Sequence, residues 1–117
     1  MEGIKIDIEI AQTVAVVHVQ GFVDTTTSPE LEKTLQGLLK EKRYQIIMDL
    51  GGVDYISSAG WGIFISEIKE IREKGGDLKL ARMSSDVNEV FELLEFGNIL
   101  QSFQSVDESL KAFAVKK

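Results

Sequence analysis

The first part of the chain alternates between apolar and polar residues in the manner of β-strands. Isoleucine stands at every second position from Ile4 to Ile10, with charged residues between, and a period of two is typical of a strand that buries one face. A second segment, 14–19, is rich in β-branched valine and ends at Gly21. We predict two strands that form a hairpin around a turn at 11–13.

Helical and strand patterns alternate in the rest of the chain. A helix begins near Thr27-Ser28-Pro29-Glu30, either with Ser28 as its cap or with Thr27 and Glu30 as a capping box. The apolar run Ile46-Ile47-Met48 suits a strand buried on both faces. A helix with an apolar stripe from Trp61 to Ile71 follows, and then a strand at 77–82. The next predicted helix has its apolar stripe at Val87, Val90, Phe91 and Leu94 and its cap at Ser84 or Ser85. A strand at 99–104 and a last helix, which begins with a capping box at Ser105–Glu108, complete the chain.

The order of these elements predicts the fold class. Strands that alternate with helices are expected to be parallel and joined by right-handed crossovers, with the helices covering the sheet. We therefore predict one α/β domain over residues 1–117. It contains a mixed sheet of about five strands and about four helices.

Composition and charge exclude several functional classes. The chain has 117 residues and a net charge of −6, and an acidic surface repels nucleic-acid backbones and anionic membranes. No stretch is long and apolar enough to span a bilayer, and the first residues lack the order of a signal peptide. We expect a cytoplasmic protein that binds no nucleic acid and does not insert into a membrane.

The residue types also limit the chemistry. The chain has no cysteine, and His18 is its single histidine, so thiol nucleophiles and thiolate metal sites are excluded. We expect no cofactor, no metal site and no enzymatic activity. His18 should point to the solvated face of its strand. Asp49 and Asp54 form either a carboxylate pair for acid–base work or, as we expect, solvated loop positions.

The segment from Asp49 to Gly62 carries the candidate function. It predicts a buried strand that runs into a turn of small residues and then into a helix, and partners meet open α/β sheets at such strand ends. Ser57 and Ser58 fall at the helix N-terminus, where free N–H groups and the helix dipole favour a negative group. A phosphate there is compatible with the fold and presents about two negative charges to a docked partner. Plain helix capping is the alternative for both serines.

Two nearby residue groups have alternative interpretations. The glycines at 60 and 62 resemble a phosphate-binding loop, but no Gly-Lys-Ser/Thr follows them. Close packing of the helix start against the sheet explains them better. Trp61 belongs either to the core or to an exposed interface. Asp24 stands beside turn residues and has either a loop-capping role or a role beside Ser58.

These residues carry a resemblance to a known family. The run Val53-x-x-Ile56-Ser57-Ser58-Ala59-Gly60-x-Gly62 resembles the signature of STAS domains, and of anti-sigma-factor antagonists in particular. Upstream, the segment 19–24 is similar to the family's Gly-x-x-Asp element. Downstream, the segment 90–100 is similar to its third helix and exit. The resemblance spans almost the whole chain in the right order.

The resemblance implies a partner-switching regulator. Members bind a serine kinase that is also the anti-sigma factor, and so free the sigma factor. The kinase phosphorylates a serine that matches Ser58, and a serine phosphatase resets the system. The family's nearby aspartate matches Asp24. The expected partner surface therefore includes Asp24, Ser57, Ser58 and Trp61.

The sequence departs from the family at two positions and leaves other functions open. Ser57 replaces an aspartate that precedes the phosphorylated serine, so Ser57 becomes a competing acceptor, and Phe22 stands where the family often has an acidic residue. The alternative is a non-phosphorylated STAS accessory subunit of a membrane transporter or of a stressosome-like scaffold. A small enzyme or a nucleotide-binding protein is a third interpretation.

Overall fold

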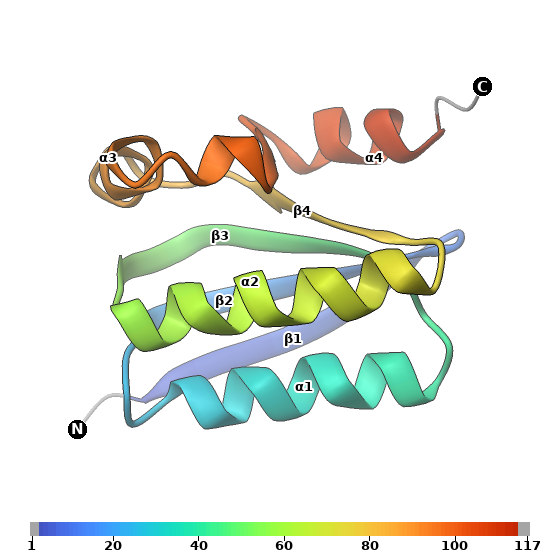
Figure 1. The fold of residues 1–117 in the computed structure, drawn as a ribbon, viewed down its shortest axis with the longest axis horizontal. Coiled ribbons are helices and arrows are strands. Elements are labelled where there is room, and N and C mark those ends of the chain that lie inside the picture. The colour runs from blue at the N-terminus through green and yellow to red at the C-terminus, as the bar shows by residue number, and fades with distance from the viewer. Residues whose placement is uncertain (1–2, 115–117) are drawn as a thin grey trace.

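One five-stranded sheet organises the molecule (Figure 1). The computed structural model describes residues 3–114. Its elements are β1 (Ile4–Ala11), β2 (Val14–Val23), α1 (Ser28–Lys40), β3 (Gln45–Ile56), α2 (Ser58–Glu73), β4 (Asp77–Ala81), α3 (Ser85–Leu93), the 3-10 helix η1 (Phe96–Asn98), β5 (Gln101–Phe103) and α4 (Val106–Ala114). The strands lie in chain order, with β1 antiparallel to β2 and the others parallel. The predicted fold class is confirmed.

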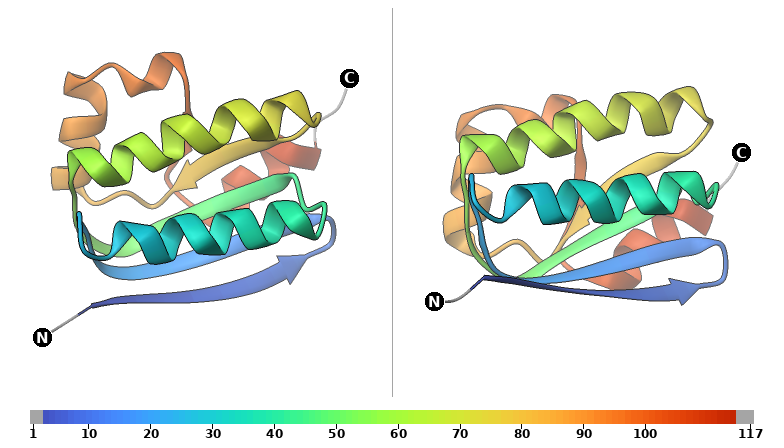
Figure 2. Two further views of the ribbon diagram at one scale, coloured as in Figure 1. Left: turned by 60° about the horizontal axis from the view of Figure 1, so that its bottom comes forward. Right: turned by 90° about the horizontal axis from the view of Figure 1, so that it is seen from below.

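Helices cover both faces of the sheet, and the faces carry different cores. Figure 2 shows α1 and α2 side by side over one face, with α4 on the other. Successive side chains of β2 point alternately into the two cores. Ala15 and Val17 belong to the large core under α1 and α2, whereas Val14 and Val16 belong to a smaller cluster with α4. The leucine stripe of α1 is buried as its spacing predicts. Apolar side chains on both faces therefore fix the position of each strand.

The edge strand β1 is buried less than its alternation suggests. Ile4 and Ile6 pack against the large core. Ile8 and Ile10 remain 46% and 44% exposed. The prediction of a half-buried strand therefore holds for the first half of β1 only.

The strand β3 continues well beyond its apolar run. The segment 51–56, which follows the apolar run where we predicted the strand to enter a turn, pairs with the end of β2, and the pairing shifts register twice on the way. Gly52 suits this place because a Cβ atom there would lie 2.6 Å from the Cγ of Gln20. The extension carries the chain directly from β3 into α2, and it defines the end of the sheet where the candidate site lies.

The helix starts agree only in part with the predicted caps. Ser84 and Ser105 accept hydrogen bonds from the N–H groups of Val87 and Glu108, at 3.2 and 3.0 Å, and so cap α3 and α4 as predicted. For α1 the cap position of Thr27 was predicted correctly, but the capping bonds expected of Thr27 or Ser28 are absent. Thr27 is the N-cap residue but its side chain makes no capping bond; its hydroxyl instead donates to the carbonyl of Phe22 at 2.7 Å. The start of α1 is thus tied back to the end of β2.

Candidate functional site

The first turn of α2 holds the two serines in different environments. Ser57 is the N-cap: its backbone is extended and its Oγ accepts the N–H of Gly60 at 3.4 Å. Ser58 is the first helical residue, and it is exposed. No acidic residue occupies this first turn, so the positive end of the helix dipole is not offset locally. The helix start therefore presents one accessible hydroxyl, that of Ser58, while the other is used in capping.

Small residues continue the surface that Ser58 begins. Gly62 and Ser66 follow Ser58 at intervals of four, and all three are exposed. Residues four apart lie above one another on one helix face. This face of α2 accordingly lacks bulky side chains along two turns, and the backbone of another protein can approach it closely.

The Asp24 loop, residues 24–27, is held in place by its own hydrogen bonds. Oδ1 of Asp24 accepts the N–H groups of Thr26 and Thr27 at 2.9 and 3.0 Å. In return the N–H of Asp24 donates to Oγ1 of Thr27 at 2.9 Å. This is the aspartate turn that polar residues of this type favour. Asp24 thus has the loop-capping role left open above, and a role beside Ser58 stays a prediction.

Two contacts bring the Asp24 loop and the start of α2 to the same end of the sheet. The N–H of Ser57 donates to the carbonyl of Val23 at 2.8 Å, and Val23 immediately precedes Asp24. Gly60 packs against the same valine: a Cβ atom on Gly60 would lie 2.6 Å from Cγ1 of Val23 and 2.8 Å from Cγ2 of Ile56. The packing explanation is therefore correct for Gly60. It does not apply to Gly62, where a Cβ atom would meet nothing within 4 Å.

Trp61 lies beneath this surface and not on it. Its side chain is in the core, and the residue is 3% exposed. The ring contacts those of Phe64, Phe91 and Phe96, with centroids 5.9, 6.0 and 5.1 Å away. Aromatic pairs at such separations stabilise the packing of the elements that carry them. Of the two alternatives for Trp61, the structure supports the core position: the ring sets where α3 and η1 sit against α2.

The outer side of α3 combines apolar and acidic residues. Val90 and Leu94, predicted in the buried stripe, are exposed, and Leu93 is 76% exposed. This part of the prediction is wrong because Val87 and Phe91 alone fill the space against α2 and the sheet. The charged residues of α3 and its C-terminal end are all acidic: Asp86, Glu89, Glu92 and Glu95. We call the exposed residues Val90, Leu93 and Leu94 the apolar ridge of α3, and the acidic residues beside them its acidic rim. The helix α3 lies beside the start of α2 (Figure 2).

A second cluster of polar side chains lies on the face of the sheet that is turned away from α1 and α2. Asp49 is buried in β3, so the expectation of a solvated loop position was wrong. Its carboxylate lies 2.6 Å from Nδ1 of His18 and 3.0 Å from Nη1 of Arg82. Nε2 of His18 lies 2.9 Å from Glu9. The hydrogen bond with Glu9, together with Asp49, raises the pKa of His18 in spite of partial burial.

This network was not visible in the sequence. His18, Asp49 and Arg82 are separated by 31 and 33 residues, so no local pattern connects them. Gly51 permits the arrangement because a Cβ atom there would lie 2.5 Å from the guanidinium carbon of Arg82. His18 is half-buried and paired, and it is not simply solvated as expected. Asp54 is exposed as expected, although it lies in β3 and not in a loop.

A buried carboxylate joins the two helices that cover the sheet. Glu67 of α2 accepts hydrogen bonds from Nε2 of Gln36 of α1 at 2.7 and 2.8 Å. Burial raises the pKa of Glu67, and the amide of Gln36 only partly offsets this effect. Glu67 is therefore a structural carboxylate inside the helix layer, away from the exposed face of α2.

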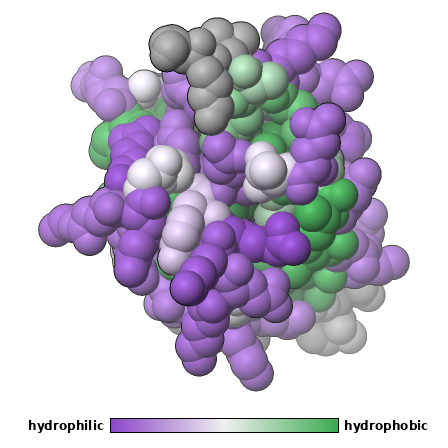
Figure 3. All heavy atoms as spheres, turned by 90° about the vertical axis from the view of Figure 1, so that its right-hand side faces the viewer, coloured by the Kyte–Doolittle hydropathy of each residue, from purple (hydrophilic) through white to green (hydrophobic). Residues whose placement is uncertain are grey.

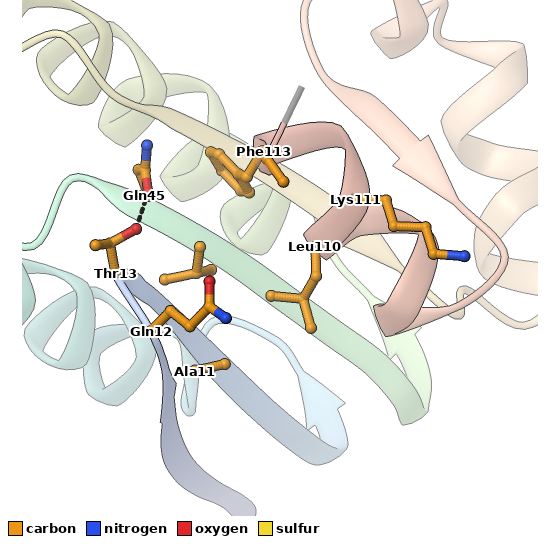
Figure 4. Close-up of a pocket in the computed structure, with 9 residues that line it drawn as sticks. Ala11, Gln12, Thr13, Gln45, Leu110, Lys111 and Phe113 are labelled. Carbon is orange, nitrogen blue, oxygen red and sulfur yellow. Dashed lines mark hydrogen bonds between the residues drawn. The ribbon is translucent and has the colours of Figure 1, made fainter. Parts of the chain in front are cut away.

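The opposite end of the molecule offers a separate hollow. Residues of the β1–β2 turn and of α4 line it, among them Thr13, Leu110 and Phe113, and Thr13 donates to Oε1 of Gln45 at its rim (Figure 4). Figure 3 views this end, where hydrophilic side chains cover most of the surface and apolar ones gather along one side. The β1–β2 turn beside this hollow lies at the other end of the sheet from the start of α2 (Figure 1), so the hollow is separate from the candidate site.

The described part of the chain offers neither a metal cluster nor a membrane-spanning helix. Residues 3–114 contain no cluster of three or more histidine or carboxylate side chains that would hold a metal ion. None of the helices described here is both long enough and apolar enough to cross a membrane.

Comparisons with known proteins agree on one family. A family model described as STAS domain matches residues 5–109. BtrV of Bordetella bronchiseptica, named as a proposed anti-sigma factor antagonist, is 29% identical over 109 residues, which make up 93% of this chain and 94% of BtrV. A sequence match of this extent includes the strand ends, the start of α2 and α3.

Solved structures share the fold at low sequence identity. The crystal structure of a proposed anti-sigma factor antagonist from Thermotoga maritima has a TM-score of 0.89 and 18% identity, over 94% of this chain and 95% of that one. The phosphorylated form of SpoIIAA, a Bacillus cell fate determinant, has a TM-score of 0.72 and 15% identity, over 93% and 99% of the two chains. At these identities the structures establish the likeness of the fold alone.

Proposed function

The chain belongs to the STAS domain family, and from this premise we propose that it is an anti-sigma factor antagonist whose binding to a serine kinase, itself the anti-sigma factor, ends when Ser58 is phosphorylated. A serine phosphatase would then restore the binding form. The observation that carries the proposal is the exposed hydroxyl of Ser58 at the N-terminus of α2. The name of the relative BtrV supports the general role.

The choice of Ser58 over Ser57 rests on their different contacts. The hydroxyl of Ser57 caps α2 through the N–H of Gly60, and a lost N-cap costs about 1 kcal/mol. A kinase that modified Ser57 would have to open this turn. Ser58 is exposed, and no capping bond has to break before its hydroxyl can react. We therefore assign the phosphate to Ser58 and keep Ser57 as the second candidate.

The fold accommodates the phosphate while the interface does not. At a helix N-terminus a phosphate gains from free N–H groups and from the helix dipole, so the domain should stay folded. The bare face formed by Ser58, Gly62 and Ser66 suits a partner that packs closely. Placing about two negative charges in such an interface costs desolvation. Phosphorylation thus acts on binding and leaves folding intact.

The proposed partner surface has three parts. The Asp24 loop and the first turns of α2 supply its polar centre. The apolar ridge of α3, with the exposed Leu93 and Leu94, supplies apolar surface that the partner would bury on binding. Its acidic rim favours a partner with basic residues around an apolar patch. Trp61 contributes indirectly, because it holds α3 against α2.

Capture from a lysate of the source cells tests the proposal. Immobilised wild-type protein should retain a serine kinase of the histidine-kinase-like class, S58D should retain none, and S57A should behave like the wild type. Circular dichroism of S58D checks that the domain is still folded. Equal capture of transporter or scaffold proteins by wild type and S58D would overturn the proposal in favour of an accessory subunit.

A further inference from the structure

The outer edge of β1 is an open strand edge. Within residues 3–114 the sheet ends at β1, which is eight residues long and pairs with β2 on one side only. Natural proteins protect such edges with proline, bulges, very short strands or charged side chains, and β1 carries only the last of these, Lys5, Asp7 and Glu9. β1 has no proline and no residue with positive φ, whereas the opposite edge, β5, has three residues. The free backbone groups of β1 are therefore suited to pair with another strand.

The side chains of β1 add an apolar strip beside this edge. Ile8 and Ile10 are both more than two-fifths exposed, and they lie on the same face of the sheet as Ile4 and Ile6, which reach the core. A strand added beside residues 4–8 would cover Ile8 with its own side chains on that face, and Ile10 would lie just beyond it. A strand with apolar side chains on this face of the sheet is therefore favoured as the partner of β1.

The charged side chains of β1 select the added strand. Lys5, Asp7 and Glu9 alternate with the isoleucines and share the other face. If a second copy of β1 pairs antiparallel around a two-fold axis at Ile6, each Lys5 faces the Asp7 of the other copy. In the same register Ile4 faces Ile8. Opposite charges and apolar pairs directly across two strands both stabilise a sheet.

Other two-fold registers of useful length oppose like charges. A slip by one residue places isoleucine opposite a charged residue, because side chains alternate between faces. An axis at Asp7 pairs Lys5 with Glu9 twice but opposes the two Asp7 carboxylates at its centre. An axis at Ile8 opposes Asp7 to Glu9 twice, and an axis at Glu9 opposes two glutamates. Among registers that are centred on one residue and pair five or more residues of β1, only the one centred on Ile6 opposes no like charges.

We propose that the protein self-associates through β1 into a two-fold dimer, in which the two sheets join at Ile6 and two Lys5–Asp7 ion pairs cross the seam. The paired segment is short, and an interface of this size belongs to the weak, reversible class. Ser58 lies outside the pairing strand, so S58D should dimerise like the wild type. The proposal is therefore independent of the partner switch.

Charge exchange across the seam tests the register. In sedimentation velocity between about 5 and 500 µM, the wild type should pass from monomer to dimer. K5D sets its new aspartate opposite Asp7 of the other copy, and D7K sets its new lysine opposite Lys5. Each variant alone should therefore dimerise at least about tenfold more weakly, because like charges face each other. A mixture of the two variants should regain dimers, because every opposed pair then joins a lysine to an aspartate.

A matched control and three outcomes decide the result. K33D makes the same charge change on an exposed position of α1 and should dimerise like the wild type. A wild type that stays monomeric to the highest concentration overturns the proposal. Dimers unaffected by K5D, or a mixture of K5D and D7K that forms no heterodimer, would equally overturn it, since they would place the contact elsewhere or in another register.

Discussion

Replacing Gly60 by alanine tests how the first turn of α2 is positioned. The added Cβ would lie 2.6 Å from Cγ1 of Val23 and 2.8 Å from Cγ2 of Ile56. Both neighbours are buried, and overpacking of a core costs about 1–3 kcal/mol. Alanine favours a helix over glycine by about 1 kcal/mol. The net result should be a loss of stability of about 0–2 kcal/mol.

Gly62 provides the matched control for Gly60. It lies in the same helix, two residues on, and a Cβ atom there would meet nothing within 4 Å. G62A should therefore gain up to about 1 kcal/mol from helix propensity alone. Urea denaturation followed by circular dichroism gives both free energies of unfolding, and G60A should be less stable than G62A by about 1–3 kcal/mol. A G60A variant as stable as G62A would refute the close packing of α2 on Val23.

Two further variants test the buried polar groups through pH. The pKa of His18 is raised in the folded state, so its interactions stabilise the fold fully below the unfolded pKa of about 6.5 and are lost as pH rises through the folded value. The loss of stability in H18Q relative to wild type, measured from urea midpoints, should therefore shrink between pH 6 and 9. A loss that stays the same over this range would contradict the reasoning. The pKa of Glu67 is also raised, by burial, so its charged form opposes folding at higher pH. E67Q should gain stability relative to the wild type at pH 7 and lose this gain near pH 4, and a thermal melt that shows the reverse order would contradict the assignment.

The spacing of apolar residues predicted which side chains of a helix share a face, but not how far that face is buried. The leucine stripe of α1 is buried because its spacing matches a helix face that must meet the sheet. Val90 and Leu94 follow the same spacing on α3 yet stay exposed. Helical spacing indicates which residues share a face, whereas the number of neighbouring elements decides how much of that face is covered. α3 packs at the end of the sheet and is covered less.

Long-range contacts account for the features that local patterns did not predict. The segment 51–56 contains glycine and aspartate, which are uncommon in strands, yet it pairs with β2 because backbone hydrogen bonds extend the ladder past the apolar run. Asp49 was expected in solvent because its partners, His18 and Arg82, are remote in the chain. Such pairings depend on the register between strands, and no local pattern encodes it.

The candidate site was predicted in part. The break from strand to helix located the start of α2, and the structure places Ser57 as its cap and Ser58 as an exposed residue. The same pattern did not tell whether Trp61 faces the core. Its burial depends on three aromatic rings, two of which come from α3 and η1.

The most direct test of the partner switch compares two defined forms of the protein. Isothermal titration calorimetry would measure the binding of the captured kinase to unmodified protein and to protein phosphorylated at Ser58 alone, with protein phosphorylated at Ser57 as the control. We predict that the phosphate on Ser58 weakens binding by at least about a hundredfold, or about 2.7 kcal/mol, while circular dichroism remains unchanged. Equal affinity of the unmodified and Ser58-phosphorylated forms would contradict the account.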